Sequence, residues 1–137
     1  KTVVGLWQLC NVMLEKQLPG LVRFLRSVMP RALIFYPLCC PECAVAARIM
    51  DLPSVAMNTF AGPGGVAGAI SSCLQSEGVS HSDFVRVARE WPPNKAAINR
   101  INDMYGLDLN SRPKYAGFLE EMAAATLTVT TTSEDLQ

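Results

Sequence analysis

Three short segments rich in apolar or β-branched residues place the strongest limit on how this chain folds. The first, residues 32–36, is an unbroken apolar run without the alternation that marks a sheet with one solvated face. Residues 54–58 predict a second buried strand, and 127–131 predict a third from their β-branched content. Helical patterns separate the strands, so we predict an α/β fold with a Rossmann-like parallel sheet flanked by helices. Both faces of such a sheet are expected to be covered.

Helical spacing accounts for much of the remaining chain. Apolar residues recur three and four positions apart in several segments. These segments are 4–29, 42–50, 66–75, 83–91 and 94–105. We expect Pro19 and Gly20 to break or kink the first helix, Asn94 to cap the last one, and Gly106 to end it.

Charge and size narrow the class of protein further. The chain has 137 residues, enough for one domain, and its 12 Lys and Arg balance 12 Asp and Glu. This balance argues against a broad nucleic-acid-binding surface. No run of 18 apolar residues is present, so we expect no transmembrane segment. The chain runs from Lys1 to Gln137 without an initiator Met or a signal peptide, and we expect it to be a piece of a longer protein.

The cysteines indicate a reducing compartment. There are five, at positions 10, 39, 40, 43 and 73, and three of them fall within five positions. An odd number in this grouping does not form the disulfide framework of a secreted protein. We therefore expect free thiols and a cytoplasmic location.

The segment Cys40-Pro41-Glu42-Cys43 has CxxC spacing at a strand-to-helix turn. A thiol at a helix N-terminus can act in redox chemistry, although the aromatic flanks typical of redox pairs are missing. Zinc is a second alternative, but it needs four ligands, and adjacent residues such as Cys39 and Cys40 rarely share one ion. Packing of a helix face is the favoured interpretation, and a CxxC redox protein stays open as a function.

A glycine-rich turn and a single histidine are further candidates. Residues 58–65 follow the second strand and open a helix, so Thr59 and Phe60 are candidates for a binding loop at the carboxyl end of a strand. A turn that only redirects the chain is the alternative, because the segment matches no phosphate-binding motif. His81 lies in a polar loop and is either a general base or a solvated side chain.

An ordered series of segments resembles a known enzyme family. The series runs LIFYPLCCP at 33–41, AAR at 46–48, LPSVAMNTFA at 52–61, INRINDMYGL at 98–107 and LTVTTTSEDLQ at 127–137. In order and spacing it resembles the acceptor half of UDP-glycosyltransferases, most of all their macrolide-glycosyltransferase branch. The resemblance covers most of residues 18–137.

The resemblance implies a GT-B fold, in which two Rossmann-like lobes enclose a cleft. Residues 1–137 would form a single partial domain, the middle and end of the N-terminal acceptor-binding lobe. The UDP-sugar donor would bind in a C-terminal lobe beyond Gln137, and the base histidine would precede Lys1. Neither a metal nor a cofactor is expected in this chain, and the fragment alone is expected to be inactive.

The resemblance also implies a set of acceptor-binding residues at the carboxyl ends of two strands, which we call the acceptor wall. The acceptor wall comprises Tyr36, Pro37, Leu38, Cys39, Asn58, Thr59, Phe60 and Ala61. Its apolar members suit a lipophilic small molecule that carries a hydroxyl group. Tyr36 stands where the family has an acid that orients its base histidine, and a phenol does not take up that charge as a carboxylate does. The alternative is therefore a non-catalytic binding or assembly module that kept the fold.

The same resemblance predicts a need for more protein around this chain. The first strands of the sheet would be missing, which leaves an exposed edge. We expect the remainder of the same polypeptide, or a companion chain, to be required for solubility.

Overall fold

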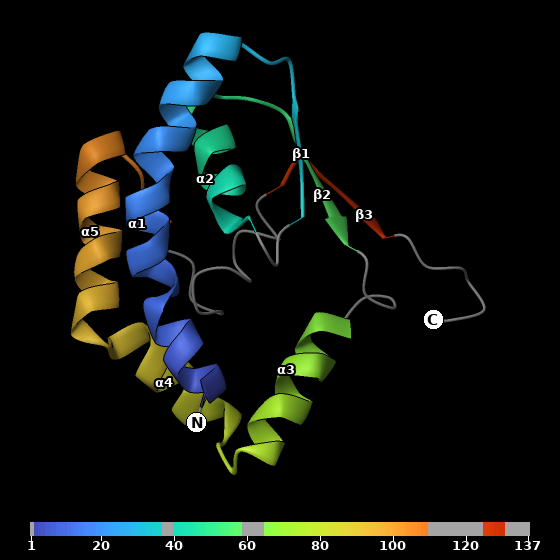
Figure 1. Ribbon diagram of the computed structural model, residues 1–137, viewed down its shortest axis with the longest axis vertical. Helices are drawn as coiled ribbons and strands as arrows, with labels where there is room; N and C mark the ends of the chain where they lie inside the picture. Colours follow the sequence, from blue (N-terminus) through green and yellow to red (C-terminus); the bar gives the residue numbers. More distant parts are fainter. Residues whose placement is uncertain (1, 37–39, 59–64, 110–124, 131–137) are drawn as a thin grey trace.

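The computed structural model describes residues 2–36, 40–58, 65–109 and 125–130. In chain order the elements are α1 (Thr2–Val28), β1 (Leu33–Phe35), α2 (Pro41–Ile49), β2 (Ser54–Asn58), α3 (Gly65–Ser76), α4 (His81–Glu90), α5 (Pro92–Tyr105) and β3 (Leu127–Thr130). Figure 1 shows the short strands next to a larger layer of helices.

The three strands form one parallel sheet, as predicted, and their order in it is β1-β2-β3. Ile34 pairs with Val55 and Phe35 with Ala56 between β1 and β2, and Asn58 pairs with Thr130 between β2 and β3. The three apolar segments therefore lie side by side and run in the same direction. This arrangement confirms the Rossmann-like parallel sheet with flanking helices.

Helix α2 connects β1 to β2 and lies against one face of the sheet. Its alanines let the helix backbone approach closely, and Ala44 packs with Phe35 of β1 and Ala56 of β2 in a buried cluster. Small side chains at such a contact bring a helix near a sheet without leaving a void. The carboxyl end of β1 and the start of α2 are thus held by the same packing.

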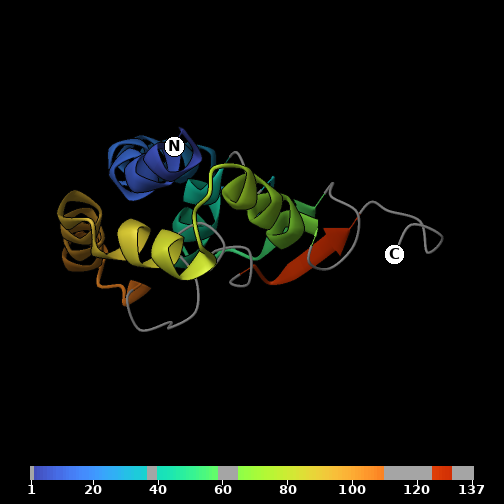
Figure 2. The same cartoon turned by 90° about the horizontal axis from the view of Figure 1, so that it is seen from below.

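Helix α1 covers the other side of α2, as Figure 2 shows from below. Its buried side chains lie on one stripe at helical spacing. The stripe and its partners on α2, on α5 and after α5 are Leu14, Leu18, Val22, Leu25, Val45, Ala46, Ile98, Ile101 and Leu109. The largest core of the described chain is therefore formed between helices, and α2 is clamped between this core and the sheet.

Helix α1 continues through Pro19, so of the two predicted effects of Pro19 and Gly20 the break is wrong and the kink stays a prediction. Proline inside a helix removes one backbone hydrogen bond and crowds the preceding turn. Leu18 and Val22, on either side of the proline, are both buried. The packing of this apolar stripe outweighs the local cost of the proline.

The junction of α4 and α5 also differs from the prediction. Trp91, not Asn94, is the N-cap of α5, and both prolines lie in the first turn, where the missing N–H groups need no partner. Asn94 is buried inside the helix instead. Helix α4 begins at His81, earlier than predicted, because the Ser80 side chain caps it by accepting a hydrogen bond from the Asp83 backbone N–H at 3.0 Å.

The C-terminal end of α5 agrees with the sequence. Gly106 adopts a left-handed conformation with φ 65°, and its backbone N–H donates to the Asn102 carbonyl. Glycine adopts this conformation without the steric penalty that a Cβ atom brings. The predicted stop at Gly106 is confirmed.

One face of the sheet is uncovered within the described residues, contrary to the expectation that both faces are covered. The exposed fractions are 68% for Ile34, 38% for Met57, 56% for Leu127 and 38% for Val129. We call these four residues the open sheet face. Figure 1 shows α1, α2 and α5 all on the opposite side of the strands. The physical reason is topological, because successive right-handed crossovers that step in one direction place their helices on the same face.

We expect the open sheet face to make the isolated chain self-associate. Replacing both Ile34 and Leu127 with lysine is expected to shift the chain toward monomer, because apolar surface at a sheet promotes association. Multi-angle light scattering over a concentration series measures this shift. Met104→Lys is the matched control, since Met104 is also exposed but lies on α5. A wild-type chain that stays monomeric at high concentration would contradict the expectation.

Candidate functional site

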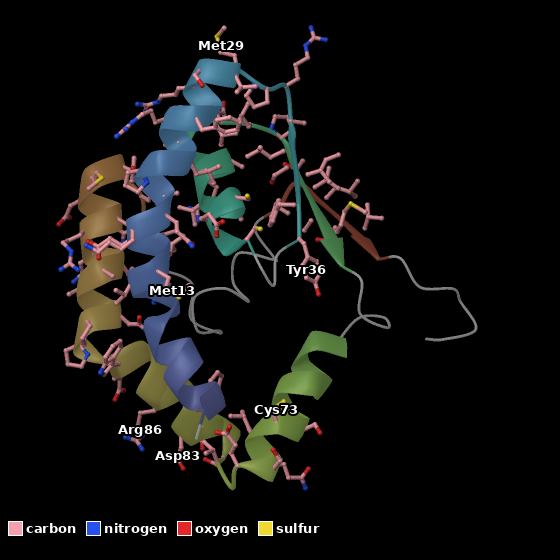
Figure 3. All side chains as sticks on the ribbon, viewed as in Figure 1. Met13, Met29, Tyr36, Cys73, Asp83 and Arg86 are labelled. Atoms are coloured by element: carbon pink, nitrogen blue, oxygen red, sulfur yellow. The ribbon has the colours of Figure 1, made fainter. Side chains whose placement is uncertain are left out.

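The candidate site lies at the carboxyl edge of the sheet. Tyr36 directly follows β1, and Asn58 is the last residue of β2, where it pairs with Thr130 at the end of β3. Because the strands are parallel, these ends share one edge, which is where open α/β sheets bind ligands. Figure 3 shows Tyr36 projecting from the end of β1 on the side of the molecule where α3 lies.

The structure therefore places two of the residues assigned to the acceptor wall. Tyr36 is half-buried after the end of β1, and Asn58 is the last residue of β2. The other members lie outside the described residues. They are Pro37, Leu38, Cys39, Thr59, Phe60 and Ala61. The acceptor wall as a whole stays a prediction.

The start of α2 adjoins Tyr36. The backbone N–H of Cys40 donates to the Tyr36 carbonyl at 3.0 Å. Cys40 is the N-cap of α2, and Pro41 is the first residue of that helix. The positive end of the helix dipole points toward this position, which favours a negative charge there. The carboxyl edge thus carries a phenol and a thiol that are joined through the backbone.

Neither Cys40 nor Cys43 is part of a disulfide, and we call these two cysteines the thiol pair. The backbone N–H of Cys43 donates to the Cys40 carbonyl at 3.1 Å. Burial raises the pKa of the Cys43 thiol to about 11, and the charges of Glu42 and Cys40 and the hydrogen bond to Cys40 act in the same direction. The Cys43 thiol also packs against the cluster of Phe35, Ala44 and Ala56, in agreement with the packing interpretation.

The raised pKa of Cys43 predicts a loss of stability in alkali. A thiol in the unfolded chain has a pKa near 9 and that of folded Cys43 is about 11, so between these values the folded state keeps a proton that the unfolded state has lost. The free energy of unfolding therefore falls as pH rises from about 9 to about 11, by about 1 kcal/mol after allowance for solvent contact. Urea titrations of wild type and Cys43→Ala at pH 8 and pH 11 measure this difference.

Cys73 on α3 provides the control for that titration. It is an exposed free thiol in the described part of the chain. Cys73→Ala is expected to keep the wild-type loss of stability between the two pH values, whereas Cys43→Ala is expected to reduce it. Equal losses in all three proteins would contradict the assignment to Cys43.

The metal and histidine alternatives gain no support from the described residues. Within them, no group of three or more His, Cys, Asp or Glu side chains could hold a metal ion. His81 is the first residue of α4 rather than a loop residue, and its side chain lies outside what the structure describes. The assignment of a general base to His81 stays untested.

Several polar contacts join segments that local sequence patterns do not connect. Arg100 of α5 donates two hydrogen bonds to the Glu15 carboxylate of α1, one of them from Nη2 to Oε2 at 2.9 Å. These bonds hold the pKa of Glu15 below its usual value. The Ser54 N–H donates to Thr126 Oγ1 at 3.0 Å, and the Thr126 N–H donates to Ser54 Oγ at 3.3 Å. The second pair ties the amino ends of β2 and β3 together.

Comparisons of the chain with protein-family models, with curated proteins and with solved structures gave no match. Among the described helices, none has both the length and the hydropathy that crossing a bilayer requires.

Proposed function

We propose that this chain forms the acceptor side of a glycosyltransferase that moves a sugar from a UDP-sugar to a hydroxyl of a lipophilic small molecule. One observation carries the proposal: β1 and β2 are parallel neighbours, so Tyr36 and Asn58 stand at one edge of one sheet. The resemblance of the strand and helix segments to UDP-glycosyltransferases supports the same assignment. The sheet would then be part of the N-terminal lobe of a GT-B fold.

In the proposed reaction the acceptor hydroxyl attacks the anomeric carbon of the sugar, and the bond from that carbon to UDP breaks. The hydroxyl proton passes to a general base, and UDP leaves with the bonding electrons. The base and the UDP-sugar site would come from the rest of the polypeptide or from a companion chain. The role of this chain is to hold the acceptor so that its hydroxyl is in line with the donor.

Tyr36 has a particular role in this proposal. Its phenol can donate or accept a hydrogen bond, whereas the family has a carboxyl group at this position. We therefore assign Tyr36 to acceptor binding rather than to orientation of a base. A base that lacks its acidic partner would have to be oriented by another group.

The test is sugar transfer by the polypeptide that contains this chain. Purified protein is incubated with radiolabelled UDP-glucose and a panel of hydroxylated lipophilic acceptors, and product is measured by chromatography. Tyr36→Ala is expected to raise the acceptor KM about tenfold, which corresponds to the loss of one good contact. Arg31→Ala is the matched control, because Arg31 is exposed at the amino end of β1. Equal effects of the two variants would contradict the proposal.

A non-catalytic binding module is the second candidate, and Tyr36 at the position of the family's acid is the observation that favours it. This module would bind the same class of lipophilic molecule without transferring a sugar. Equilibrium dialysis of the acceptors that the transfer assay uses distinguishes the two functions. Binding that Tyr36→Ala weakens, without transfer from any UDP-sugar, would favour the module and exclude the enzyme.

A further inference from the structure

We propose that the thiol pair, Cys40 and Cys43, is a thiol–disulfide exchange site that reduces a low-molecular-weight disulfide and closes to an intrachain disulfide. This chemistry does not depend on the proposed sugar transfer. It is carried by the placement of both thiols at the start of α2.

The first step of the inference is proximity. Cys40 is the N-cap of α2 and Cys43 lies three residues later, within the first turn. Residues three apart on a helix have Cβ atoms about 5–6 Å apart, and a disulfide requires only a modest approach from there. The bond from the Cys43 N–H to the Cys40 carbonyl, 3.1 Å long, holds the turn in this conformation.

The second step is the difference between the two thiols. Cys40 and Cys43 are both partly buried, but Cys40 is the N-cap, at the positive end of the helix dipole, where negative charge is favoured. Burial, the neighbouring charge of Glu42 and the bond to Cys40 keep the proton on Cys43. The thiolate is the nucleophile in disulfide exchange, so Cys40 attacks first and Cys43 acts second.

The third step is the balance of the reaction. The Cys40 thiolate attacks one sulfur of the external disulfide, the S–S bond breaks, and one thiolate leaves. Cys43 then loses its proton to solvent, its thiolate attacks the Cys40 sulfur, and the bond from Cys40 to the external sulfur breaks. The second thiolate leaves, and both released thiolates take up a proton from solvent. The thiol pair loses two electrons and two protons overall, and the external disulfide becomes two thiols.

Trapping with oxidised glutathione tests the proposal on the polypeptide that contains this chain. In wild type we expect a Cys40–Cys43 disulfide, identified by mass spectrometry of peptides from the unreduced protein. In Cys43→Ser the exchange is expected to stop at glutathione bound to Cys40. In Cys40→Ser this disulfide cannot form, and oxidised glutathione is expected to react with Cys43 at least about tenfold more slowly than with Cys40 in Cys43→Ser, because the attacking thiolate is lost.

Two controls separate this result from general thiol oxidation and from misfolding. Cys73→Ser removes an exposed thiol on another helix and should leave the Cys40–Cys43 disulfide unchanged. Cys39→Ser should also leave it unchanged. A disulfide between Cys39 and Cys43 in wild type, or a Cys43 thiol in Cys40→Ser that reacts with oxidised glutathione as fast as Cys40 does in Cys43→Ser, would overturn the proposal. Circular dichroism spectra confirm that each serine variant is folded before the exchange is measured, and an unfolded Cys40→Ser or Cys43→Ser is replaced by the alanine variant.

Discussion

Replacing Leu18 with alanine is expected to lower the free energy of unfolding by about 3–5 kcal/mol, the range for a fully buried leucine. Leu18 is 0% exposed and belongs to the cluster in which α1 meets α2 and α5. The neighbouring positions on α2 include Val45 and Ala46, whose backbone is held by the sheet on the other side. Since the surrounding helices cannot close the space completely, the variant loses both burial and packing. Urea denaturation followed by circular dichroism measures the change.

Phe24→Ala is the matched control for Leu18→Ala. Phe24 lies on the same helix but is 60% exposed, so its truncation is expected to change stability by less than about 1 kcal/mol. The comparison separates the loss of packing from any effect on the helix itself. If the two variants lose similar stability, α1 does not form the described core. The same core packs on α2, which carries the thiol pair, and α2 packs on the sheet. Loss of this core would therefore also change the position of the candidate site.

The order and direction of the elements could be predicted because burial leaves a local pattern in the sequence. The strand at residues 32–36 follows from a continuous apolar run, and its parallel pairing follows from the helices between the strands. Tyr36 and Asn58 could be assigned to one edge for the same reason, since parallel strands end on the same side. The parallel α/β fold and the positions of Tyr36 and Asn58 could therefore be predicted from the sequence.

Contacts between distant segments could not be predicted in this way. Glu15 and Arg100 are 85 residues apart, and Ser54 and Thr126 are 72 apart. No local spacing signals such a pair, because each partner resembles an ordinary surface residue or strand end. The open sheet face has a similar cause, since an apolar strand sequence indicates a need for cover but not whether the described helices supply it.

The predicted helix boundaries were wrong where two structural signals in the sequence compete. Asn94 is a good N-cap residue, yet Pro92 and Pro93 also suit the first turn, and the structure starts α5 at Pro92. At Pro19 the local rule predicts a break or a kink, and tertiary packing of the apolar stripe keeps the helix unbroken. Local propensity is small compared with burial of several large side chains, so the core determines these positions.

The same conflict at Pro19 makes Pro19→Ala the second large prediction, with an expected gain of about 1–3 kcal/mol in the free energy of unfolding. Alanine restores the backbone N–H that a helix interior uses and removes the proline ring from the preceding turn. Differential scanning calorimetry, which also reports the midpoint temperature, measures the gain. A stabilised α1 should leave the transfer and exchange assays unchanged, because Pro19 lies away from the carboxyl edge of the sheet.

Gly20→Ala provides the control for the gain at Pro19. A Cβ atom at Gly20 would meet no other atom within 4 Å, so only the backbone freedom of the unfolded chain changes. Its expected gain is about 0.5–1 kcal/mol, below that of Pro19→Ala. Loss of stability in Pro19→Ala beside a gain in Gly20→Ala would show that the core requires the local shape that the proline imposes. Pro19 would then stabilise the folded chain rather than destabilise it, because it would shape α1 to pack against α2 and α5.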